Sequence, residues 1–462
     1  MSADTVVFTF EGKQLTARPG VSIAAALAAH GVHTLGRSVK YHRPRGYTCG
    51  FSACGDCPLT VNGLPGVESC SREVAPGDEV SRELGWPSAS FDLLRVADLV
   101  ARWIPAGFQF RLFTRAPRLS RASGRVLKNL AGGGRFPTVA AARASQAVDV
   151  RRVDADVVVV GAGVSGLQSA RVAAAAGRSV VLVERPAPTR RAEVRTEPVI
   201  GMDGAEVTRA EALGELRDAV AADTRIGHVT GTVFGVMDGL VLVDSGATRW
   251  EITPGHLVVA TGSYETTPLF RGNDRPGIHL ADGALKLRRE SGRPLGRRVV
   301  VATDSDRGHA VAAALRNAGD TVVRVLDTRS TPGVEGRADG LRSGTDAEYG
   351  IELAGTRGWG RVSAVVYRRE NGDRGVVRAD ALVLAFARRP ADELVLQTEY
   401  HDEEAVGAPP LTVVGSASGA DRTDLHRTAT LLRDALAETS TSPSAPSSAP
   451  PTSAIPFHPR KK

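Results

Sequence analysis

The chain has 462 residues, of which 42% are hydrophobic and 24% charged, and its formal charge of +7 comes chiefly from arginine. This length allows two or three domains with sizeable cores, and no apolar run is long enough to cross a membrane as a helix. We expect no basic stretch to be interleaved with exposed aromatic residues, so a solvated basic surface is favoured over nucleic-acid binding.

Residues 4–20 have the pattern of a β-hairpin, with a run of β-branched and aromatic residues, a turn and an alternating run. Ser22 can then cap a short alanine-rich helix that ends at Gly31. A further strand is expected just before Asn62 and Gly63, a dipeptide typical of tight hairpin turns.

All four cysteines fall in one short stretch, with the spacing C-x4-C-x2-C and a fourth cysteine after twelve further residues. A two-iron, two-sulfide cluster needs four thiolates, and this is the plant-type way of supplying them. The small residues between the cysteines let the backbone wrap tightly and point amide groups at sulfur. Together with the preceding elements, this loop outlines a β-grasp ferredoxin-like domain over residues 1–85. The predicted ligands of a [2Fe-2S] cluster are Cys49, Cys54, Cys57 and Cys70.

Structural zinc and disulfide bonds are the alternative interpretations of these cysteines. Only Cys54 and Cys57 have the C-x2-C spacing of a zinc ribbon, and no second such pair follows. Disulfides suit small secreted domains, whereas this long chain starts with no charged and then apolar segment and has no signal cleavage site. We therefore expect a cytoplasmic protein whose cluster carries electrons.

The rest of the chain divides by composition into a connector, two nucleotide-binding-like domains and a tail. Residues 86–150 lack a clean motif, although residues 91–104 have helical periodicity, and we interpret them as a connector. Apolar strands then alternate with helical stretches, which indicates open α/β sheets. The fold class is therefore α/β with an α+β N-terminal domain. We assign residues 151–265 and 383–437 to a first Rossmann-like domain, residues 266–382 to a second, degenerate one, and residues 438–462 to a disordered tail.

A glycine fingerprint opens the first Rossmann-like domain. Between a buried strand and a helix, three glycines in the pattern G-x-G-x-x-G allow a tight turn, close backbone approach to a pyrophosphate, and close packing of helix on strand. An acidic residue at the end of the next strand would bind ribose hydroxyls and repel a 2′-phosphate, which favours FAD or NAD over NADP. A glycine-rich turn without a cofactor is the alternative. The predicted binding residues are Gly161, Ala162, Gly163, Ser165, Gly166 and Glu184.

A second strand-helix-strand unit, at residues 298–327, has the same outline but lacks the glycines. Asp304 and Asp306 stand in their place, and these carboxylates would repel a pyrophosphate. A structural relic is therefore favoured over a working NAD(P)H site. Between the two units, another buried strand ends at Thr261 and Gly262, and an open sheet would bring this turn near the first nucleotide.

The chain resembles the α subunits of heteromeric enzymes that oxidise amines and amino acids: sarcosine oxidase, opine oxidase, hydrogen cyanide synthase, and proline and hydroxyproline dehydrogenases. The likeness extends to about residue 437, and its most specific segments are residues 37–46, 106–110, 260–265 and 273–277. The cysteine loop is similar to the small ferredoxin subunits of the cyanide synthase and hydroxyproline dehydrogenase group, fused here to a reductase-like part.

The resemblance implies a pair of Rossmann-like domains of the pyridine nucleotide-disulfide reductase type and a role in electron transfer. In these enzymes, amine oxidation takes place on a separate β flavosubunit similar to D-amino-acid oxidase, so we expect such a partner. No residue of this chain is assigned a catalytic role.

Three departures from the family pattern modify these expectations. The sequence stops near residue 462, without the folate-binding domain of sarcosine oxidase α, so methylene transfer to folate is not expected from this polypeptide. The stretch after Glu184 is arginine-rich where Gly-Gly is usual. Gly415 is counted with the nucleotide site, but no Asp follows it to hold a ribityl chain. FAD is favoured on fold analogy, with NAD instead or in addition as the alternative.

Three functions of different classes follow. The first is the electron-transfer subunit of a dehydrogenase or oxidase for a secondary amine or amino acid, in the sarcosine, glycine, proline, hydroxyproline or opine class. The second is a self-sufficient NAD(P)H-dependent ferredoxin reductase that feeds an oxygenase, which NADH alone would reduce. The third is a non-catalytic scaffold subunit that holds a nucleotide and contains neither iron nor flavin.

Overall fold

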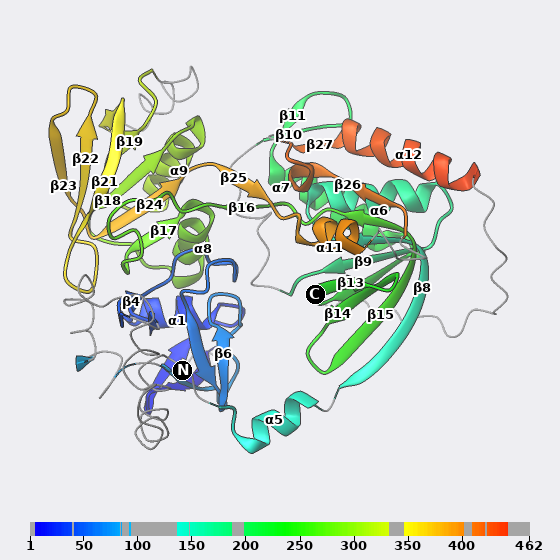
Figure 1. Ribbon diagram of the computed structural model, residues 1–462, viewed down its shortest axis with the longest axis horizontal. Helices are drawn as coiled ribbons and strands as arrows, with labels where there is room; N and C mark the ends of the chain where they lie inside the picture. Colours follow the sequence, from blue (N-terminus) through cyan, green and yellow to red (C-terminus); the bar gives the residue numbers. More distant parts are fainter. Residues whose placement is uncertain are drawn as a thin grey trace, which may run out of the picture. The chain divides into compact units, whose positions relative to one another are not determined.

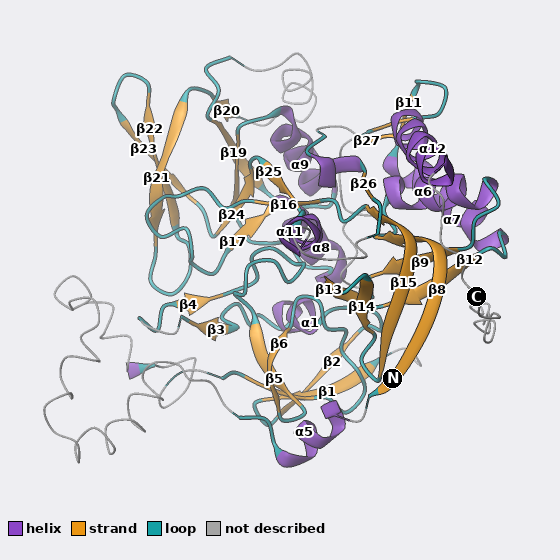
Figure 2. Cartoon of the chain, turned by 45° about the vertical axis from the view of Figure 1, so that its right-hand side comes forward, coloured by secondary structure: helices purple, strands orange, loops and turns teal. Residues whose placement is uncertain are grey.

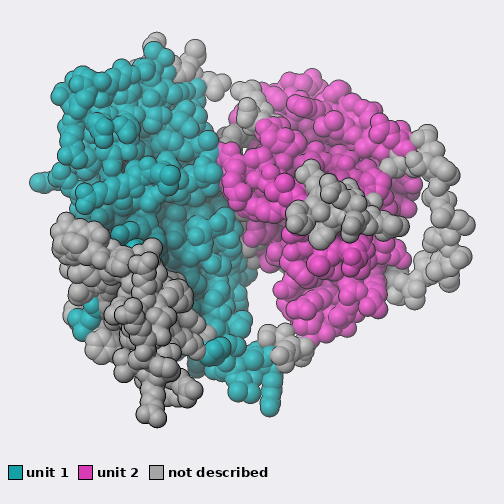
Figure 3. Space-filling view, viewed as in Figure 1, with its two compact units in different colours: residues 1–144, 187–189, 265–387 teal, residues 145–186, 190–264, 388–462 magenta. Residues whose placement is uncertain are grey.

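The computed structural model describes residues 5–38, 41–83, 85, 92–93, 136–146, 148–186, 198–331, 346–401, 409–420 and 423–441. The chain forms two compact units, coloured separately in Figure 3. Unit 1 consists of residues 1–144, 187–189 and 265–387, and unit 2 consists of residues 145–186, 190–264 and 388–462. Unit 1 contains the four cysteines, and unit 2 contains the glycine fingerprint.

The N-terminal part of unit 1 is a five-stranded sheet with one helix packed against it (Figure 1). Its elements are β1 (Val6–Phe10), β2 (Lys13–Ala17), α1 (Ile23–Ala29), β5 (Pro58–Val61), β6 (Leu64–Glu68) and β7 (Glu79–Ser81). The strand order is β2-β1-β7-β5-β6, in which β1 and β7 pair in parallel and the other neighbours are antiparallel. A short ribbon of β3 (Gly36–Arg37) and β4 (Pro44–Arg45) precedes the cysteine loop.

Two predicted hairpin turns are confirmed. Glu11 and Gly12 have φ values of 49° and 78°, and Asn62 and Gly63 have φ values of 51° and 77°. Two consecutive left-handed residues form the turn whose twist matches that of the flanking antiparallel strands.

The predicted N-cap of α1 is also confirmed, and it has a second role. The Ser22 hydroxyl accepts a hydrogen bond from the Ala25 amide at 3.3 Å and donates to a Glu290 carboxylate oxygen at 2.6 Å. Ser22 is fully buried. Its side chain therefore joins α1 to a helix more than 260 residues away in the sequence.

The C-terminal part of unit 1 is a parallel sheet of the order β17-β24-β18-β19-β20. Its elements are β17 (Ile278–Leu280), α8 (Ala281–Ser291), β18 (Val299–Thr303), α9 (Asp306–Asn317), β19 (Val322–Asp327), β20 (Ala347–Glu348) and β24 (Ala381–Ala385). A separate antiparallel sheet contains β21 (Ile351–Arg357), β22 (Ala364–Arg369) and β23 (Arg374–Arg378). Side chains of this part and of the N-terminal sheet share one hydrophobic core, which includes Leu27, Leu59, Leu287 and Val301.

Unit 2 contains a parallel sheet that continues into an antiparallel meander. Its main elements are β8 (Asp149–Val160), α6 (Val164–Ala175), β9 (Val180–Glu184), α7 (Arg209–Ala222), β12 (Ile226–Thr230), β13 (Thr232–Met237), β14 (Leu240–Asp244), β15 (Thr248–Val259), β26 (Leu411–Val413) and α12 (Leu425–Thr441). The strand order is β12-β9-β8-β15-β14-β13, with β26 also paired to β15. The long strands β8 and β15 lie side by side in parallel (Figure 2). Helices α6, α7 and α12 pack on one face of the parallel part.

Shorter elements complete the described chain. They are α5 (Val139–Gln146), β10 (Val199–Ile200), β11 (Glu206–Val207), β16 (Ser263–Glu265), β25 (Arg388–Pro390), α11 (Glu393–His401), a 3-10 turn η4 (Gly415–Ser418) and β27 (Thr423–Asp424).

The predicted fold class is confirmed: an α+β N-terminal sheet precedes two α/β sheets of the Rossmann-like kind. Two details were not predicted. Helix α5 lies within the expected connector, and α12 continues to Thr441, beyond the expected start of the tail at residue 438. The helix expected at residues 91–104 lies outside the described residues apart from positions 92–93, and residues 106–110 lie outside them completely. In the described part of the chain, no helix is long and apolar enough to span a bilayer.

Replacing Ser22 by Ala is expected to lower the free energy of unfolding by about 2–3 kcal/mol, because the substitution removes both a helix cap and a donor to a buried carboxylate. Thr208→Ala is the matched control, since Thr208 caps α7 through an exposed capping box and its loss is expected to cost only about 1 kcal/mol. Urea unfolding followed by circular dichroism measures both. Equal effects would show that the contact between Ser22 and Glu290 adds nothing to the cap.

Candidate functional site

The structure gathers the four predicted cluster ligands around one point in unit 1. Cys49, Cys54 and Cys57 lie in the loop before β5, and Cys70 follows β6. The thiols of Cys54 and Cys70 both interact with the Cys49 thiol, and Cys70 also interacts with Cys57. None of the four cysteines, all of which lie in described segments, forms a disulfide. This arrangement is compatible with the predicted four-thiolate site.

Three backbone amides of the loop donate to the sulfur atoms: Phe51 and Ala53 to Cys49 at 3.4 and 3.3 Å, and Ser52 to Cys70 at 3.3 Å. The loop can wrap around the sulfurs in this way because its glycines take left-handed conformations. Amide hydrogen bonds to sulfur stabilise thiolates, and they are one of the means by which a protein sets the potential of an iron-sulfur cluster. This chemistry fits the predicted cluster.

The clustered thiols shift one another's pKa. Hydrogen bonds from Cys54 and Cys70 lower the pKa of Cys49, against the opposing effect of burial. The bond to Cys49 and burial together raise the pKa of both Cys54 and Cys70. Because metal ligation requires thiolates, loading this site with iron must release protons.

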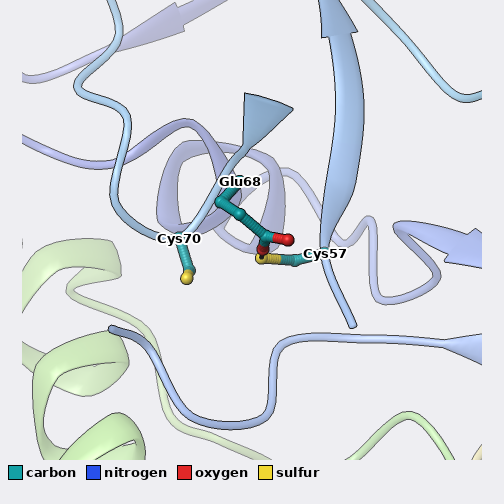
Figure 4. Close-up of side chains that lie close together, drawn as sticks. All are labelled: Cys57, Glu68 and Cys70. Atoms are coloured by element: carbon teal, nitrogen blue, oxygen red, sulfur yellow. Dashed lines mark hydrogen bonds between the residues drawn. The ribbon is translucent and has the colours of Figure 1, made fainter. Parts of the chain in front are cut away.

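Glu68 adds a carboxylate that no sequence pattern marks. The Cys57 thiol donates to its Oε2 atom at 3.1 Å (Figure 4), and the ligand atoms of Cys57, Glu68 and Cys70 lie within 4.8 Å of one another. Burial raises the pKa of Glu68. Iron-sulfur clusters of this type are held by thiolates, so we interpret Glu68 as a neighbour of the cluster and the four thiols as its ligands.

The cysteine loop lies directly against β17 and α8 of the same unit. The Leu280 amide donates to the Thr48 carbonyl at 2.9 Å, and the His279 Nδ1–H donates to the Tyr47 carbonyl at 2.6 Å. Burial lowers the pKa of His279 to about 4, so its ring is neutral at pH 7. A Cβ atom on Gly283 would come within 2.6 Å of the Cys49 carbonyl oxygen. The loop therefore has no room for a side chain at this position of α8.

The predicted dinucleotide residues meet at one edge of the unit 2 sheet. Gly161 follows β8, Glu184 ends β9, and Gly262 follows β15, so all three lie at carboxyl ends of parallel strands. The chain order of these strands reverses between β8 and β15, which is where open α/β sheets bind their ligands. Gly415 lies at the same edge, after β26.

Two of the three fingerprint glycines are required by backbone contacts at this edge. Gly161 has a φ of 107°, and a Cβ there would collide with the Ala260 carbonyl. A Cβ on Gly166 would collide with the Gly161 carbonyl, so helix α6 packs tightly on β8 only through this glycine. Gly163 differs from both, because a Cβ there would meet no atom within 4 Å. Space is therefore free in front of the first turn of α6, where a pyrophosphate would bind.

The remaining predicted residues surround this opening. Ala162 is buried, and Ser165 lies so close to Gly415 that a Cβ on Gly415 would collide with the Ser165 hydroxyl. The Thr261 hydroxyl donates to the Ala391 carbonyl at 2.6 Å. The Thr261 side chain therefore stabilises the turn after β15. Thr261 belongs to the candidate site only because it lies at the end of this strand.

The corresponding edge of the parallel sheet in unit 1 is crossed by ion pairs. Asp327 ends β19 and is bound by Arg329 at 2.7 Å and by His309 at 3.0 Å. Arg329 also reaches Asp306 at 2.8 Å, at the start of α9. These bonds connect the strand end to the turn where the ribose and pyrophosphate of a nucleotide would lie. Asp327 occupies the position of a ribose-binding acid. The sequence alone did not indicate this position, because the glycines that normally identify such a site are missing.

Comparison with known families agrees with this division. Residues 3–84 match the 2Fe-2S iron-sulfur cluster binding domain, and residues 155–405 match the pyridine nucleotide-disulphide oxidoreductase family. The second match covers more than half of the 462 residues. The chain belongs to the pyridine nucleotide-disulphide oxidoreductase family. The chain also contains a region that matches the iron-sulfur domain, which favours an iron-sulfur cluster over zinc at the cysteines.

The sequence of this oxidoreductase is similar to those of sarcosine oxidase α subunits. Sarcosine oxidase subunit alpha of Rhizobium meliloti (strain 1021) is 30% identical over 398 residues, which are 82% of this chain and 39% of the relative. The same subunit of Corynebacterium sp. (strain P-1) is 29% identical over 417 residues, or 86% of this chain and 38% of the relative. This chain therefore spans about two fifths of the length of the curated relatives it matches.

A solved structure agrees with the fold of this oxidoreductase. The L-proline dehydrogenase structure from P. horikoshii matches with a TM-score of 0.57 at 22% identity, over 90% of this chain and 69% of that chain. This likeness supports the architecture that unites an N-terminal sheet with two α/β sheets.

Gly163→Ala is expected to leave the fold intact and to lower the dinucleotide content of the purified protein at least tenfold, because the new methyl group meets no protein atom but would occupy the space of the pyrophosphate. Gly214→Ala in α7 is the matched control: it also meets no protein atom and should keep the nucleotide. Nucleotide released by heat or acid is quantified by chromatography. Full occupancy in the G163A variant would place the nucleotide elsewhere.

Gly283→Ala is expected to reduce the iron content of the purified protein severalfold, because the added methyl group would push against the carbonyl of Cys49, a predicted ligand of the cluster. Helix propensity alone would predict the opposite, since alanine stabilises a helix by about 1 kcal/mol relative to glycine. Iron analysis and the melting temperature distinguish these effects. An unchanged iron content with a raised melting temperature would contradict close packing of the loop on α8.

Proposed function

We propose that this chain is the electron-transfer α subunit of a heteromeric FAD-dependent dehydrogenase or oxidase that acts on a secondary amine or amino acid. The observation that carries the proposal is the presence in one chain of a four-cysteine loop with amide-to-sulfur hydrogen bonds and of an open nucleotide edge. The relatives named sarcosine oxidase subunit alpha support an amine substrate of this kind. The resemblance of the sequence extends the proposed substrates to the sarcosine, glycine, proline, hydroxyproline or opine class.

Two cofactors are proposed for the chain. A [2Fe-2S] cluster would be held by the four cysteines, of which Cys54 and Cys70 both act on the pKa of Cys49, and the sulfurs of Cys57 and Cys70 lie within 4.8 Å of each other. FAD would bind at the edge formed by the glycine fingerprint, Glu184, the Thr261-Gly262 turn and Gly415, with NAD instead or in addition as the alternative. Glu184 supports a nucleotide without a 2′-phosphate, since its carboxylate would repel such a group.

Amine oxidation is proposed to take place on a partner β flavosubunit similar to D-amino-acid oxidase. Oxidation of an amine to an imine releases two electrons, which a flavin accepts as a pair, whereas a [2Fe-2S] cluster carries one electron at a time. The cluster would therefore be reduced and reoxidised twice for each amine oxidised. No catalytic residue is assigned to this chain.

The parallel sheet of unit 1 is proposed to serve as a support for the cluster domain rather than as a second nucleotide site. The ion pairs of Asp327 and Asp306 with Arg329 occupy the edge that a nucleotide would need. The cysteine loop instead uses β17 and α8 of this sheet as its base.

Anaerobically purified chain is expected to contain about two iron and two sulfide per polypeptide, and to give a paramagnetic signal after reduction, because the four thiolates suit a [2Fe-2S] cluster. Cys57→Ser is expected to lose most of the iron. Iron, sulfide and zinc analyses, with electron paramagnetic resonance, provide the measurements. Stoichiometric zinc without sulfide would contradict the proposal.

The direction of electron flow separates the proposal from the reductase alternative. NADH added to the isolated chain is expected to reduce the cluster slowly or not at all, because the second nucleotide edge is filled by ion pairs. The amine substrate should reduce it only when the β subunit is present. Rapid reduction by NADH without a partner would instead support a self-sufficient reductase.

A further inference from the structure

A lysine of α8 is buried beneath the cysteine loop. Lys286 is completely inaccessible to solvent, and its Nζ atom donates to the Gly50 carbonyl at 2.6 Å and to the Cys70 carbonyl at 2.7 Å. Gly50 follows the first cysteine, and Cys70 is the last of the four. One ammonium group therefore joins the two chain segments that supply the predicted ligands.

The closest contacts of the Lys286 ammonium are with residues of the cysteine loop. The ammonium lies 4.8 Å from the centre of the Phe51 ring and 3.9 Å from the Glu290 carboxylate, which is itself bonded to Ser22. A buried charge with so loose an ion pair is costly unless other groups compensate for the lost water. Here the carbonyls of Gly50 and Cys70 and the Phe51 ring compensate for the lost water, while the Glu290 carboxylate is bonded to Ser22.

A second polar group points to the same place. Tyr47 is 4% exposed, and its hydroxyl has no hydrogen-bond partner among the described residues. A Cβ atom built on Gly50 would come within 2.7 Å of this oxygen, so the hydroxyl lies beside the residue that follows Cys49. Burial raises the pKa of Tyr47 well above its usual value, as do the negative charges of Glu290 and of the cysteines.

A buried hydroxyl without a protein partner requires an explanation, and an acceptor that is not a protein atom, such as a water or a bound cofactor, supplies one. The ionisable groups that act on this hydroxyl are Glu290 and the thiols of Cys70, Cys49 and Cys57. Two carboxylates lie elsewhere on the loop. Glu68 lies at Cys57, and Asp56 lies 3.8 Å from Arg45. The positive charge and the free donor are therefore both on the side of the loop that faces β17 and α8.

We propose that Tyr47 and Lys286 set the reduction potential of the cluster, with the Tyr47 hydroxyl as a hydrogen-bond donor to a cluster sulfur and the Lys286 ammonium as a fixed positive charge. Both are positioning residues, and the inference rests on the [2Fe-2S] cluster of the proposed function. Reduction adds one negative charge to the cluster, and hydrogen bonds to sulfur and a nearby cation both favour the more negative state. Each group therefore raises the potential.

The decisive variant is Tyr47→Phe, which removes the hydroxyl and keeps the ring. Its cluster is expected to have a lower midpoint potential than the wild type. At a fixed solution potential, the ratio of reduced to oxidised cluster should fall at least threefold, which corresponds to about 28 mV for a one-electron couple. Tyr367→Phe is the matched control, because this buried tyrosine of the same unit donates instead to Glu348 and should leave the potential unchanged. Anaerobic redox titration followed by electron paramagnetic resonance gives both the potential and the g-values.

Lys286→Met tests the charge, because methionine keeps most of the stem and has no ammonium group. A lower midpoint potential is again expected. Arg288→Met is the control: it removes a positive charge from the same helix, where Arg288 pairs with Asp320, and it should leave the potential unchanged. If the methionine variant does not retain iron, Lys286→Gln replaces it, since an amide can still donate to the loop carbonyls.

The outcomes separate this inference from the proposed function. Wild-type protein that lacks iron and sulfide would overturn the proposed function. A wild-type cluster whose potential and g-values are unchanged both in Y47F and in the iron-loaded Lys286 variant would overturn the present proposal and leave the proposed function intact.

Discussion

Close packing of the cysteine loop on β17 and α8 is the constraint on which the rest of unit 1 depends. Two glycines make it possible, because a Cβ on Gly50 would lie 3.0 Å from the Cα of Gly283, and a Cβ on Gly283 would press on the Cys49 carbonyl. The same contact buries Lys286 and encloses Tyr47. The surroundings of the predicted cluster are thus built by a domain that is more than 200 residues away in the sequence.

Two of the segments that carry the resemblance to sarcosine oxidase α meet at this contact. Arg45, from the stretch before the cysteines, pairs with Asp274 at 2.9 Å, and a Cβ on Gly46 would lie 3.1 Å from Pro276. Neither segment has an evident chemical role when the sequence is considered alone. In the structure they hold the cluster domain on its support, which gives a physical reason for their specific composition.

The two parallel sheets have similar topology and contrasting edges. In unit 2, the glycines leave space in front of α6, and the strand ends converge on it. In unit 1, the equivalent region is closed by the bonds of Arg329 to Asp306 and Asp327. A fold that can bind a nucleotide twice therefore retains one open edge, while the other sheet supports the cysteine loop.

The sequence by itself determined the features that depend on local geometry: the hairpin turns, the cap at Ser22, the fingerprint glycines and the four clustered cysteines. Such features are visible because each depends on residue types a few positions apart. It did not reveal helix α5, or that Glu68, Lys286 and Tyr47 lie at the predicted cluster site. Only the tertiary structure decided which lysine and which tyrosine are buried against the cysteine loop, because burial and charge at that point depend on segments brought together by folding.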